Sequence, residues 1–339
     1  MINPLLYDVL SIQSETHECT RMMDFVMNYC LDMGCDVDYD TAGNVYVTKG
    51  LAKTYPCIVS HMDTVHDILP DNQYKVICDD DVAMAYNPIK KEMTGVGGDD
   101  KVGIYIALQM LRDLEECKAA FFVDEEIGCV GSSQCDMDFF RNVRFVLQCD
   151  RKGNSDFVYN ILGTQLYNEK FFNDVIPIIT EFGYSEAVGG LTDVYQLTQN
   201  NVGVCVANMS CGYYNPHSDD EIVCIEDVEN CRRMVYQIMI RCTDVYECVH
   251  ESKSYSRWNW DDYDYKPGRV YHDNKFTKDK YKLDGMYDIC CCCGEWVEED
   301  DIIDHSICKS CYGFNEPIET PTVYKAPTKT NNKPKNKKK

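Results

Sequence analysis

The stretch CIVSHMDTV, residues 57–65, contains the feature that decides the fold: an apolar run that ends in polar residues. Residues 57–60 have the length and composition of a buried strand, and His61 and Asp63 follow directly after it. In open α/β sheets, ligand sites lie just past the carboxyl ends of the strands. The stretch therefore predicts one strand of an α/β sheet with a functional site at its end.

Working outward, residues 1–243 alternate between strand and helix patterns. Further strands are expected at residues 45–48, 119–123, 144–149 and 202–207, and helices at residues 24–33, 101–114 and 226–241. Strands separated by helices are typical of a layered domain with helices on both faces of the sheet. We predict a three-layer α/β/α domain with a mixed, mostly parallel central sheet over residues 1–243, followed by a small zinc-ribbon unit.

The charge distribution excludes several classes of partner. The 339 residues include 33 Lys plus Arg and 56 Asp plus Glu, and the last fifteen residues contain seven Lys and no acid. The strongly acidic remainder would repel nucleic acid and anionic membranes. No apolar run reaches the roughly 18 residues that span a bilayer, and the N-terminal stretch lacks the pattern of a signal peptide. We therefore expect a cytoplasmic protein whose 21 Cys are mostly reduced thiols.

Four other stretches place acids or histidine where elements are expected to begin or end. GVGGDDKVG, residues 95–103, places Asp99 and Asp100 before a helix, and FFVDEEIGCVGS, residues 121–132, ends a strand in three acids. VLQCD ends a strand in Asp150, and NPHSDDE places His217 before the last helix. Each alone is explained as well by a helix cap or a solvated loop.

Together these residues suit two zinc ions. The set comprises two imidazoles and three carboxylates, namely His61, Asp99, Glu126, Asp150 and His217. Each ion would take one histidine and one carboxylate, while a third carboxylate bridges both and open positions remain for water. Glu125, next to Glu126, would stay free of metal and take a proton.

These motifs, in this order, resemble the co-catalytic di-zinc peptidases of the peptidase T, carboxypeptidase G and succinyl-diaminopimelate desuccinylase type, and the related single-domain zinc aminopeptidases. The resemblance covers roughly residues 5–243 and includes SIQSETHE and DTAGNV near the start. It implies that Asp99 bridges the two metals and precedes a cis peptide bond. It assigns the remaining ligands in two pairs: His61 with Asp150, and Glu126 with His217.

The resemblance also implies two residues that act beside the metals. Asp63 would orient His61 through its second ring nitrogen. Glu125 would be the general base that generates a zinc-bridged hydroxide and later protonates the leaving amine. Lys101 has no implied catalytic role and would balance the local acids.

One departure from this family concerns the lid. Only 66 residues separate Asp150 from His217, too few for the inserted lid and dimerisation domain of the peptidase T type. We therefore expect the architecture of the single-domain aminopeptidases, without the lid histidine that stabilises the oxyanion. Three tyrosines could replace it: Tyr184, Tyr213 and Tyr214. In GGLTDVYQL, Thr192 and Asp193 resemble a segment near the family's substrate pocket, and a turn with a helix cap explains them equally well.

The C-terminal part is expected to form separate units. Residues 244–288 have the composition of a connector, and residues 315–339 that of a disordered basic tail. Between them, residues 289–314 contain two C-x-x-C-G knuckles typical of a zinc ribbon with one structural zinc. The expected ligands are Cys290, Cys293, Cys308 and Cys311, with Cys291, Cys292 and His305 as alternatives. The tail would act as a solubilising end or contact nucleic acid or an acidic partner.

The expected function is hydrolysis of amide bonds, as an aminopeptidase or a di- or tripeptidase that acts on small peptides. An N-acyl amino acid amidohydrolase would use the same site, and Co²⁺ or Mn²⁺ could replace the catalytic zinc. An inactive hydrolase scaffold that binds partners through the ribbon and the Lys-rich tail is the alternative from another class.

Overall fold

The computed structural model describes residues 2–79 and 81–250, and the backbone of four short strands nearer the C-terminus. These strands form two antiparallel pairs: β15 (Tyr287–Ile289) with β16 (Trp296–Glu298), and β17 (Ile302–Asp304) with β18 (Ile307–Cys308). The zinc-ribbon ligands Cys290, Cys293 and Cys311 lie outside the described residues, as do the side chain of Cys308, residues 251–286 of the connector and the tail. None of the described helices is long and apolar enough to cross a membrane.

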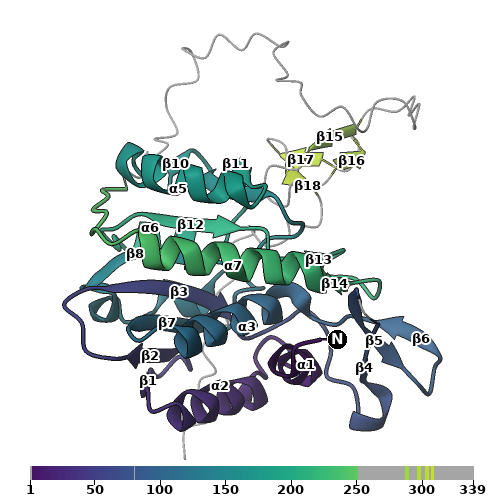
Figure 1. Cartoon of the computed structure of the whole chain (residues 1–339). Coiled ribbons are helices and arrows are strands. Elements are labelled where there is room, and N and C mark those ends of the chain that lie inside the picture. The colour runs from purple at the N-terminus through teal and green to yellow at the C-terminus, as the bar shows by residue number, and fades with distance from the viewer. Residues whose placement is uncertain are drawn as a thin grey trace, which may run out of the picture.

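A nine-stranded mixed sheet forms the centre of the domain (Figure 1). Its strand order is β1-β2-β7-β3-β8-β12-β9-β10, and β11 also pairs with β9. The strands are β1 (Asp36–Tyr39), β2 (Val45–Lys49), β3 (Tyr55–His61), β7 (Cys117–Phe122), β8 (Val143–Gln148), β9 (Asp156–Ile161), β10 (Thr164–Gln165), β11 (Ser185–Gly189) and β12 (Val206–Met209). The central strands β7, β3, β8 and β12 run parallel, so their carboxyl ends meet at one edge.

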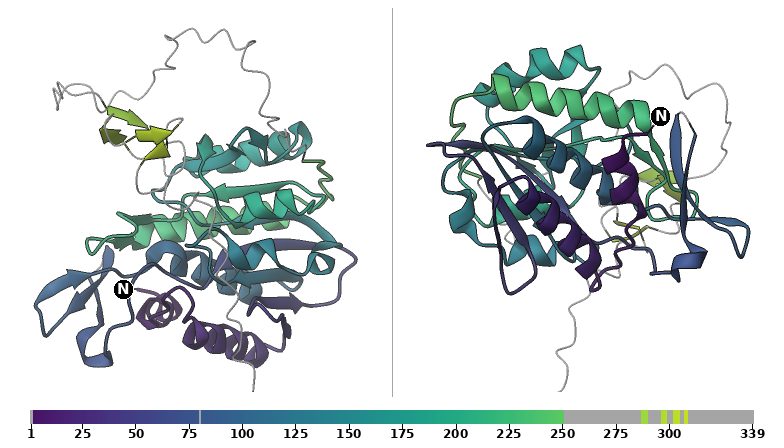
Figure 2. Two further views of the ribbon diagram at one scale, coloured as in Figure 1. Left: turned by 180° about the vertical axis from the view of Figure 1, so that it is seen from behind. Right: turned by 60° about the horizontal axis from the view of Figure 1, so that its bottom comes forward.

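Four helices form a row along one face of this sheet, where Figure 1 shows them one above another. They are α2 (Thr20–Asp32), α3 (Gly98–Asp113), α7 (Ile225–Arg241) and α5 (Glu169–Glu181), and α1 (Pro4–Ser11) packs against α3. The opposite face, seen from behind in Figure 2, carries the shorter α6 (Asp193–Gln199), which contacts α4 (Val130–Ser133). The α/β class with a mixed sheet is confirmed, and its two helical layers are unequal.

The structure places two expected elements differently. The strand expected at residues 202–207 is β12 (Val206–Met209), because Val204 instead forms an isolated antiparallel bridge with Glu247. The helix expected at residues 101–114 begins earlier, at Gly98. Nearly all of α3 is buried, because it lies between the sheet, α1 and α7. The sequence pattern predicts one buried face for this helix, whereas the structure buries residues on nearly all of its faces.

A second, antiparallel sheet was not expected from the sequence. Its order is β13 (Tyr213–Tyr214), β14 (Ile222–Cys224), β5 (Val82–Asn87) and β4 (Lys75–Cys78), and β6 (Glu92–Thr94) pairs with β5. Short 3-10 turns occur at η1 (Asp71–Gln73) and η2 (Met137–Phe140). The pairing of β14 with β5 joins the segment between His61 and Asp99 to the hairpin that carries His217.

The segment between Asp150 and His217 contributes strands and helices to the main domain. Its strands β9, β10, β11 and β12 belong to the central sheet, and its helices α5 and α6 cover the two faces of that sheet. This segment therefore forms no separate lid domain, in agreement with the single-domain architecture expected from its length.

Candidate metal centre

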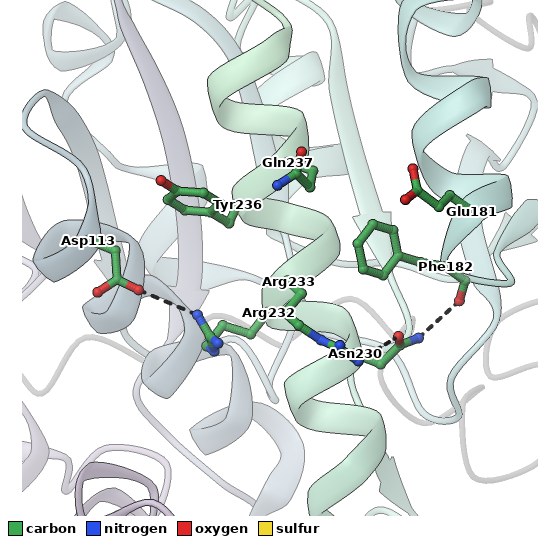
Figure 3. A pocket seen from close by; sticks show the side chains of 8 residues that line it. All are labelled: Asp113, Glu181, Phe182, Asn230, Arg232, Arg233, Tyr236 and Gln237. Atoms are coloured by element: carbon green, nitrogen blue, oxygen red, sulfur yellow. Dashed lines mark hydrogen bonds and ion pairs between the residues drawn. The ribbon is translucent and has the colours of Figure 1, made fainter.

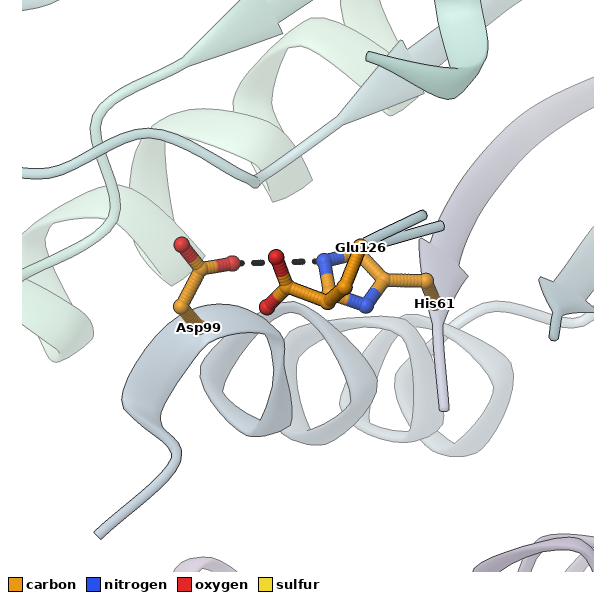
Figure 4. Close-up of side chains that lie close together, drawn as sticks. All are labelled: His61, Asp99 and Glu126. Atoms are coloured by element: carbon orange, nitrogen blue, oxygen red, sulfur yellow. Dashed lines mark hydrogen bonds and ion pairs between the residues drawn. The ribbon is translucent and has the colours of Figure 1, made fainter. Parts of the chain in front are cut away.

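The five expected ligands lie at the carboxyl edge of the central sheet and on the loops that face it. His61 is the last residue of β3, and Asp99 lies in the first turn of α3. Glu126 follows β7, Asp150 follows β8, and His217 lies between β13 and β14. Figure 4 shows His61, Asp99 and Glu126 converging from three different elements. The parallel strands β3, β7 and β8 end at the same edge of the sheet, and α3 and the β13–β14 loop face that edge. Residues up to 156 positions apart in the chain thus come together.

The carboxylate of Asp99 lies between the two imidazoles. Its Oδ1 is 3.2 Å from Nε2 of His61, and its Oδ2 is 3.3 Å from Nε2 of His217. The same nitrogen of His61 lies 3.7 Å from Oδ1 of Asp150, and that of His217 lies 3.1 Å from Oε2 of Glu126. Each oxygen of Asp99 therefore faces a separate histidine and carboxylate pair, which is the arrangement that a bridging ligand requires.

Asp100 is a buried carboxylate of this centre that the sequence analysis left without a role as a ligand. It follows Asp99 through a cis peptide bond, as the resemblance implied. Its oxygens accept hydrogen bonds from Oγ of Ser60 at 2.5 Å, from the backbone N–H of His61 at 3.3 Å and from that of Gly103 at 3.0 Å. These donors fix the first turn of α3 against the end of β3.

Two groups of side chains in the described part of the chain offer ligand atoms that all lie within 4.8 Å of one another. One comprises His61, Asp99 and Glu126, and the other comprises His61, Asp100 and Asp150. Both contain His61, so the acids converge on this histidine.

The electrostatics of the centre favour a bound cation. Burial, and next the negative charge of Asp99, raises the pKa of Asp150 to about 6 and that of Glu126 to about 7. Burial also acts to raise the pKa of Asp99, but hydrogen bonds from His217 and His61 outweigh it and hold that pKa well below its usual range. Buried carboxylates that crowd one another in this way are stabilised by an opposite charge.

A test of whether metal fits comes from Glu126. Its Oε1 is buried and has no hydrogen-bond partner among the described residues, although buried polar atoms normally have one. Imidazole and carboxylate donors in this number suit zinc and similar divalent ions. The unpaired oxygen and the donor set therefore fit a metal centre.

Asp63 supports the centre in a broader way than the sequence indicated. The backbone carbonyl of Asp63 is the group nearest to Nδ1 of His61, at 2.9 Å, while its carboxylate Oδ1 lies at 3.5 Å. The carboxylate accepts the backbone N–H of Glu125 at 3.0 Å, the N–H of Glu126 at 3.4 Å and the hydroxyl of Thr16 at 3.0 Å. Asp63 thus holds both the histidine and the loop with the two glutamates.

Glu125 faces the centre from that loop. Its Oε2 lies 4.0 Å from Nε2 of His61, and its Oε1 accepts a hydrogen bond from the thiol of Cys129 at 3.4 Å. Burial raises the pKa of Glu125 well above its usual range. A carboxyl group with a raised pKa beside the ligands can hold a proton and pass it on.

Of the three tyrosines considered for the oxyanion, one contacts an expected ligand. The hydroxyl of Tyr213 donates to Oδ1 of Asp150 at 3.1 Å. Those of Tyr184 and Tyr214 donate to the backbone oxygen of Ser210 and to Asp227, at 2.8 and 2.6 Å.

Asp150 is positioned by a polar network that sequence analysis found only in part. Oγ1 of Thr192 lies 2.7 Å from Oδ2 of Asp150, and the amide of Gln148 donates to the same oxygen at 3.2 Å. Gln148 also donates to Asp193 at 3.1 Å, and the side chain of Asn208 bonds both backbone groups of Asp150. The Thr192–Asp193 segment therefore lies at the centre, while Gln148 and Asn208 carry no motif that would identify them.

Glu221 is a second support that no sequence pattern indicated. This fully buried carboxylate accepts hydrogen bonds from the backbone N–H of Gly97 at 2.7 Å and that of Asp99 at 3.1 Å. It also lies 3.0 Å from Nε2 of His66. In the sequence it is the last of three consecutive acids, so only the pairing of β14 with β5 distinguishes it from its neighbours.

Lys101 contacts backbone and hydroxyl oxygens rather than the ligand carboxylates. Its Nζ lies 2.9 Å from the carbonyl oxygen of Val96, 3.4 Å from that of Leu10 and 3.5 Å from the hydroxyl of Tyr74. It therefore links α1 to the glycine-rich turn before Asp99.

A cavity of about 890 Å³ lies beside α7, away from the ligands (Figure 3). It reaches Asp113, at the opposite end of α3 from Asp99 and about 20 Å along the helix. Its polar groups largely bond one another: Arg232 pairs with Asp113 at 3.4 Å, and Asn230 donates to the backbone of Phe182 at 2.9 Å. This cavity contains none of the expected catalytic residues.

Comparison with known proteins agrees with this geometry. The family model of the M42 glutamyl aminopeptidases matches residues 85–234, a range that contains every expected catalytic ligand except His61. No curated protein matches the chain.

Solved structures share the fold at low sequence identity. Aminopeptidase PepT from Bacillus cereus is 16% identical over 71% of this chain and 99% of its own, with a TM-score of 0.58. A tripeptidase from Staphylococcus aureus is 16% identical over 71% and 99% of the two chains, with a TM-score of 0.56. An aminopeptidase from the archaeon Desulfurococcus kamchatkensis is 15% identical over 69% and 93%, with a TM-score of 0.53. The chain has the co-catalytic metallopeptidase fold, and with the matched family model and the ligand cluster this identifies it as an enzyme of the metallopeptidase type.

Proposed function

We propose that the chain is a di-metal aminopeptidase that removes residues from small peptides. The observation that carries this proposal is the position of Asp99, whose two oxygens face His61 and His217 at 3.2 and 3.3 Å. The matched M42 glutamyl aminopeptidase model, and structural relatives named as an aminopeptidase and a tripeptidase, favour an exopeptidase over a deacylase.

In this proposal His61 and Asp150 would hold one ion, His217 and Glu126 would hold the other, and Asp99 would serve both. Two zinc ions, or Co²⁺ or Mn²⁺, would lower the pKa of a water and polarise the substrate carbonyl. Glu125 would accept a proton from the attacking water and pass it to the leaving amine, because it lies beside His61 and burial raises its pKa.

Asp63 and Tyr213 hold the proposed ligands and Glu125 in these positions. Asp63 fixes the backbone of Glu125 and Glu126, and the hydrogen bond from Tyr213 fixes Asp150. Because the ligands are held before any substrate binds, little reorganisation is needed during the reaction.

A substrate panel tests the proposal. The full chain, loaded with zinc, would be assayed on aminoacyl anilides, dipeptides and the same dipeptides with an acetylated amino group, alongside N-acyl amino acids. We expect cleavage of the substrates with a free amino group. Preferential cleavage of the N-acyl amino acids would instead show a deacylase, and a chain that binds both metals but turns over no substrate would be a binding scaffold.

The structural zinc in the C-terminal ribbon is a separate proposal, based on the spacing of Cys290, Cys293, Cys308 and Cys311. Metal analysis of the full chain should then give roughly three zinc ions under saturating conditions. The Cys293→Ser variant should lose one ion, and an His61→Ala variant should lose metal without affecting the ribbon. A Cys293→Ser variant with unchanged zinc content would exclude the ribbon site.

A further inference from the structure

Two cysteines, Cys205 and Cys248, lie near each other outside the metal centre. They lie where residues 246–248, close to the end of the described chain, pair with the segment just before β12. Residues 203–205 and 246–248 run antiparallel, with Val204 bridged to Glu247. The N–H of Cys205 donates to the carbonyl of Tyr246 at 2.8 Å, and that of Cys248 donates to Gly203 at 3.0 Å. Since side chains alternate along a strand, Cys205 and Cys248 lie on the same face of this antiparallel strand pair.

His250 completes the cluster. Its Nε2 lies 2.9 Å from the carbonyl oxygen of Val204, and its Nδ1 lies 3.1 Å from that of Gln165. Carbonyl oxygens only accept hydrogen bonds, and an imidazole donates from both nitrogens only when it is protonated. The two carbonyls therefore select the imidazolium form of His250.

A buried imidazolium needs an anion. His250 is only 8% exposed, and the acidic group that contacts it in the described chain is the thiol of Cys248, 3.9 Å from its Nδ1. The neighbouring thiol of Cys205, and then the contact with His250, lower the pKa of the Cys248 thiol to about 5. The neighbouring thiol of Cys248, together with burial, raises the pKa of the Cys205 thiol well above its usual range.

The two cysteines differ in access as well as in charge. Cys205 is fully buried, whereas Cys248 is partly exposed. Two other described cysteines are partly exposed, Cys78 and Cys224, but burial raises the pKa of both thiols. Cys248 thus combines an accessible thiolate with a neighbouring thiol, which is typical of a redox-sensitive cysteine and its resolving partner.

We propose that Cys248 is a site of oxidative modification, at which a peroxide forms a sulfenic acid that Cys205 converts to a disulfide. In the first step the sulfur of Cys248 attacks one peroxide oxygen. The S–O bond forms, the O–O bond breaks, the sulfur loses two electrons, and the second oxygen leaves as hydroxide and is protonated to water.

In the second step the sulfur of Cys205 attacks the sulfur of Cys248. The S–S bond forms, the S–O bond breaks, and the hydroxide leaves as water with the proton of Cys205. This chemistry involves none of the metal ligands, so it stands independently of the proposed peptidase activity.

Alkylation of the reduced full chain tests the first requirement, an accessible thiolate. Brief treatment with iodoacetamide at pH 6, followed by peptide mass mapping, compares Cys248 with Cys78 and Cys224 in one sample. At this pH the fraction of Cys248 present as thiolate should exceed the thiolate fractions of Cys78 and Cys224 roughly a thousandfold. A thiolate with a low pKa is a weaker nucleophile, so the alkylation rate of Cys248 should exceed theirs by only about tenfold. Labelling of Cys248 no faster than that of Cys78 and Cys224 would overturn the proposal.

Hydrogen peroxide tests the second requirement. Limiting peroxide should yield a peptide pair joined through Cys205 and Cys248, lighter by two hydrogen atoms. In the Cys205→Ser variant, dimedone should instead trap a sulfenic acid at Cys248. A Cys248 that stays reduced in the wild-type chain while Cys78 or Cys224 oxidises would refute the proposal, and so would a disulfide from Cys248 to another residue.

Discussion

Replacing Glu221 by Gln tests how the candidate metal centre is held. The carboxylate of Glu221 accepts three hydrogen bonds: from the N–H of Gly97 at 2.7 Å, from that of Asp99 at 3.1 Å and from His66 at 3.0 Å. In Glu221→Gln one acceptor oxygen becomes an NH₂ group. Whichever way the amide turns, this NH₂ group faces an N–H donor, so at least one hydrogen bond is lost inside the protein.

The magnitude follows from that unpaired donor. Losing a hydrogen bond to a charged acceptor and leaving a buried donor unpaired costs about 1–3 kcal/mol. For a domain of this size each kcal/mol corresponds to about 2–4 °C, so we expect the Tm of the metal-free variant to fall by about 5 °C. Because the lost contacts fix the backbone of Asp99, zinc affinity should fall by about 10–100-fold.

The assay combines thermal unfolding without metal and calorimetric titration with zinc. Asp220→Asn is the matched control, since it removes the same charge from the neighbouring, exposed residue. If Glu221→Gln matched Asp220→Asn in both Tm and zinc affinity, Glu221 would not position Asp99, and the reasoning from its three hydrogen bonds would be refuted.

Three further predictions concern the same centre. Glu125→Gln should lower turnover by about 10²–10⁴-fold while the metal content, measured by elemental analysis, stays unchanged; retained turnover would remove Glu125 from the role of base. Gly103→Ala would place a Cβ 2.3 Å from the carboxylate of Asp100, so urea unfolding should show a loss of about 1–3 kcal/mol, and wild-type stability would contradict this packing. The metal-free protein should lose stability as pH rises from about 4 to 7. The folded-state pKa values of Asp150 and Glu126, about 6 and about 7, are raised above their usual values, so over this range the folded state binds more protons than the unfolded state. Urea unfolding at pH 5 and 7.5 should show this loss in a chelator and much less of it with zinc, and an equal pH dependence in both conditions would argue against metal at these carboxylates.

The sequence predicts those parts of the centre that follow long apolar runs. His61 and Asp150 each lie at the end of a buried strand, and the parallel order of β3 and β8 brings two such ends together. Buried strands produce strong local patterns of apolar residues, and ligand sites in α/β sheets lie past the carboxyl ends of strands. These two rules suffice to predict His61 and Asp150.

The second sheet cannot be predicted from such local sequence patterns. Its strands are two to six residues long, and among them only β5, at residues 82–86, has an extended apolar run. Its existence depends on β14 pairing with β5, a contact between residues about 140 positions apart. Without that contact, Glu221 is simply the last acid of a polar loop.

The same pairing explains why the second sheet matters for the proposed chemistry. Glu221 lies four residues after His217 on the loop between β13 and β14, and its carboxylate fixes the backbone of Asp99. The loop that carries His217, the histidine proposed for one metal ion, therefore also positions Asp99, the carboxylate proposed to serve both ions. A displacement of this loop would move His217 and release Asp99 together, so the two halves of the centre should assemble or fail as one unit.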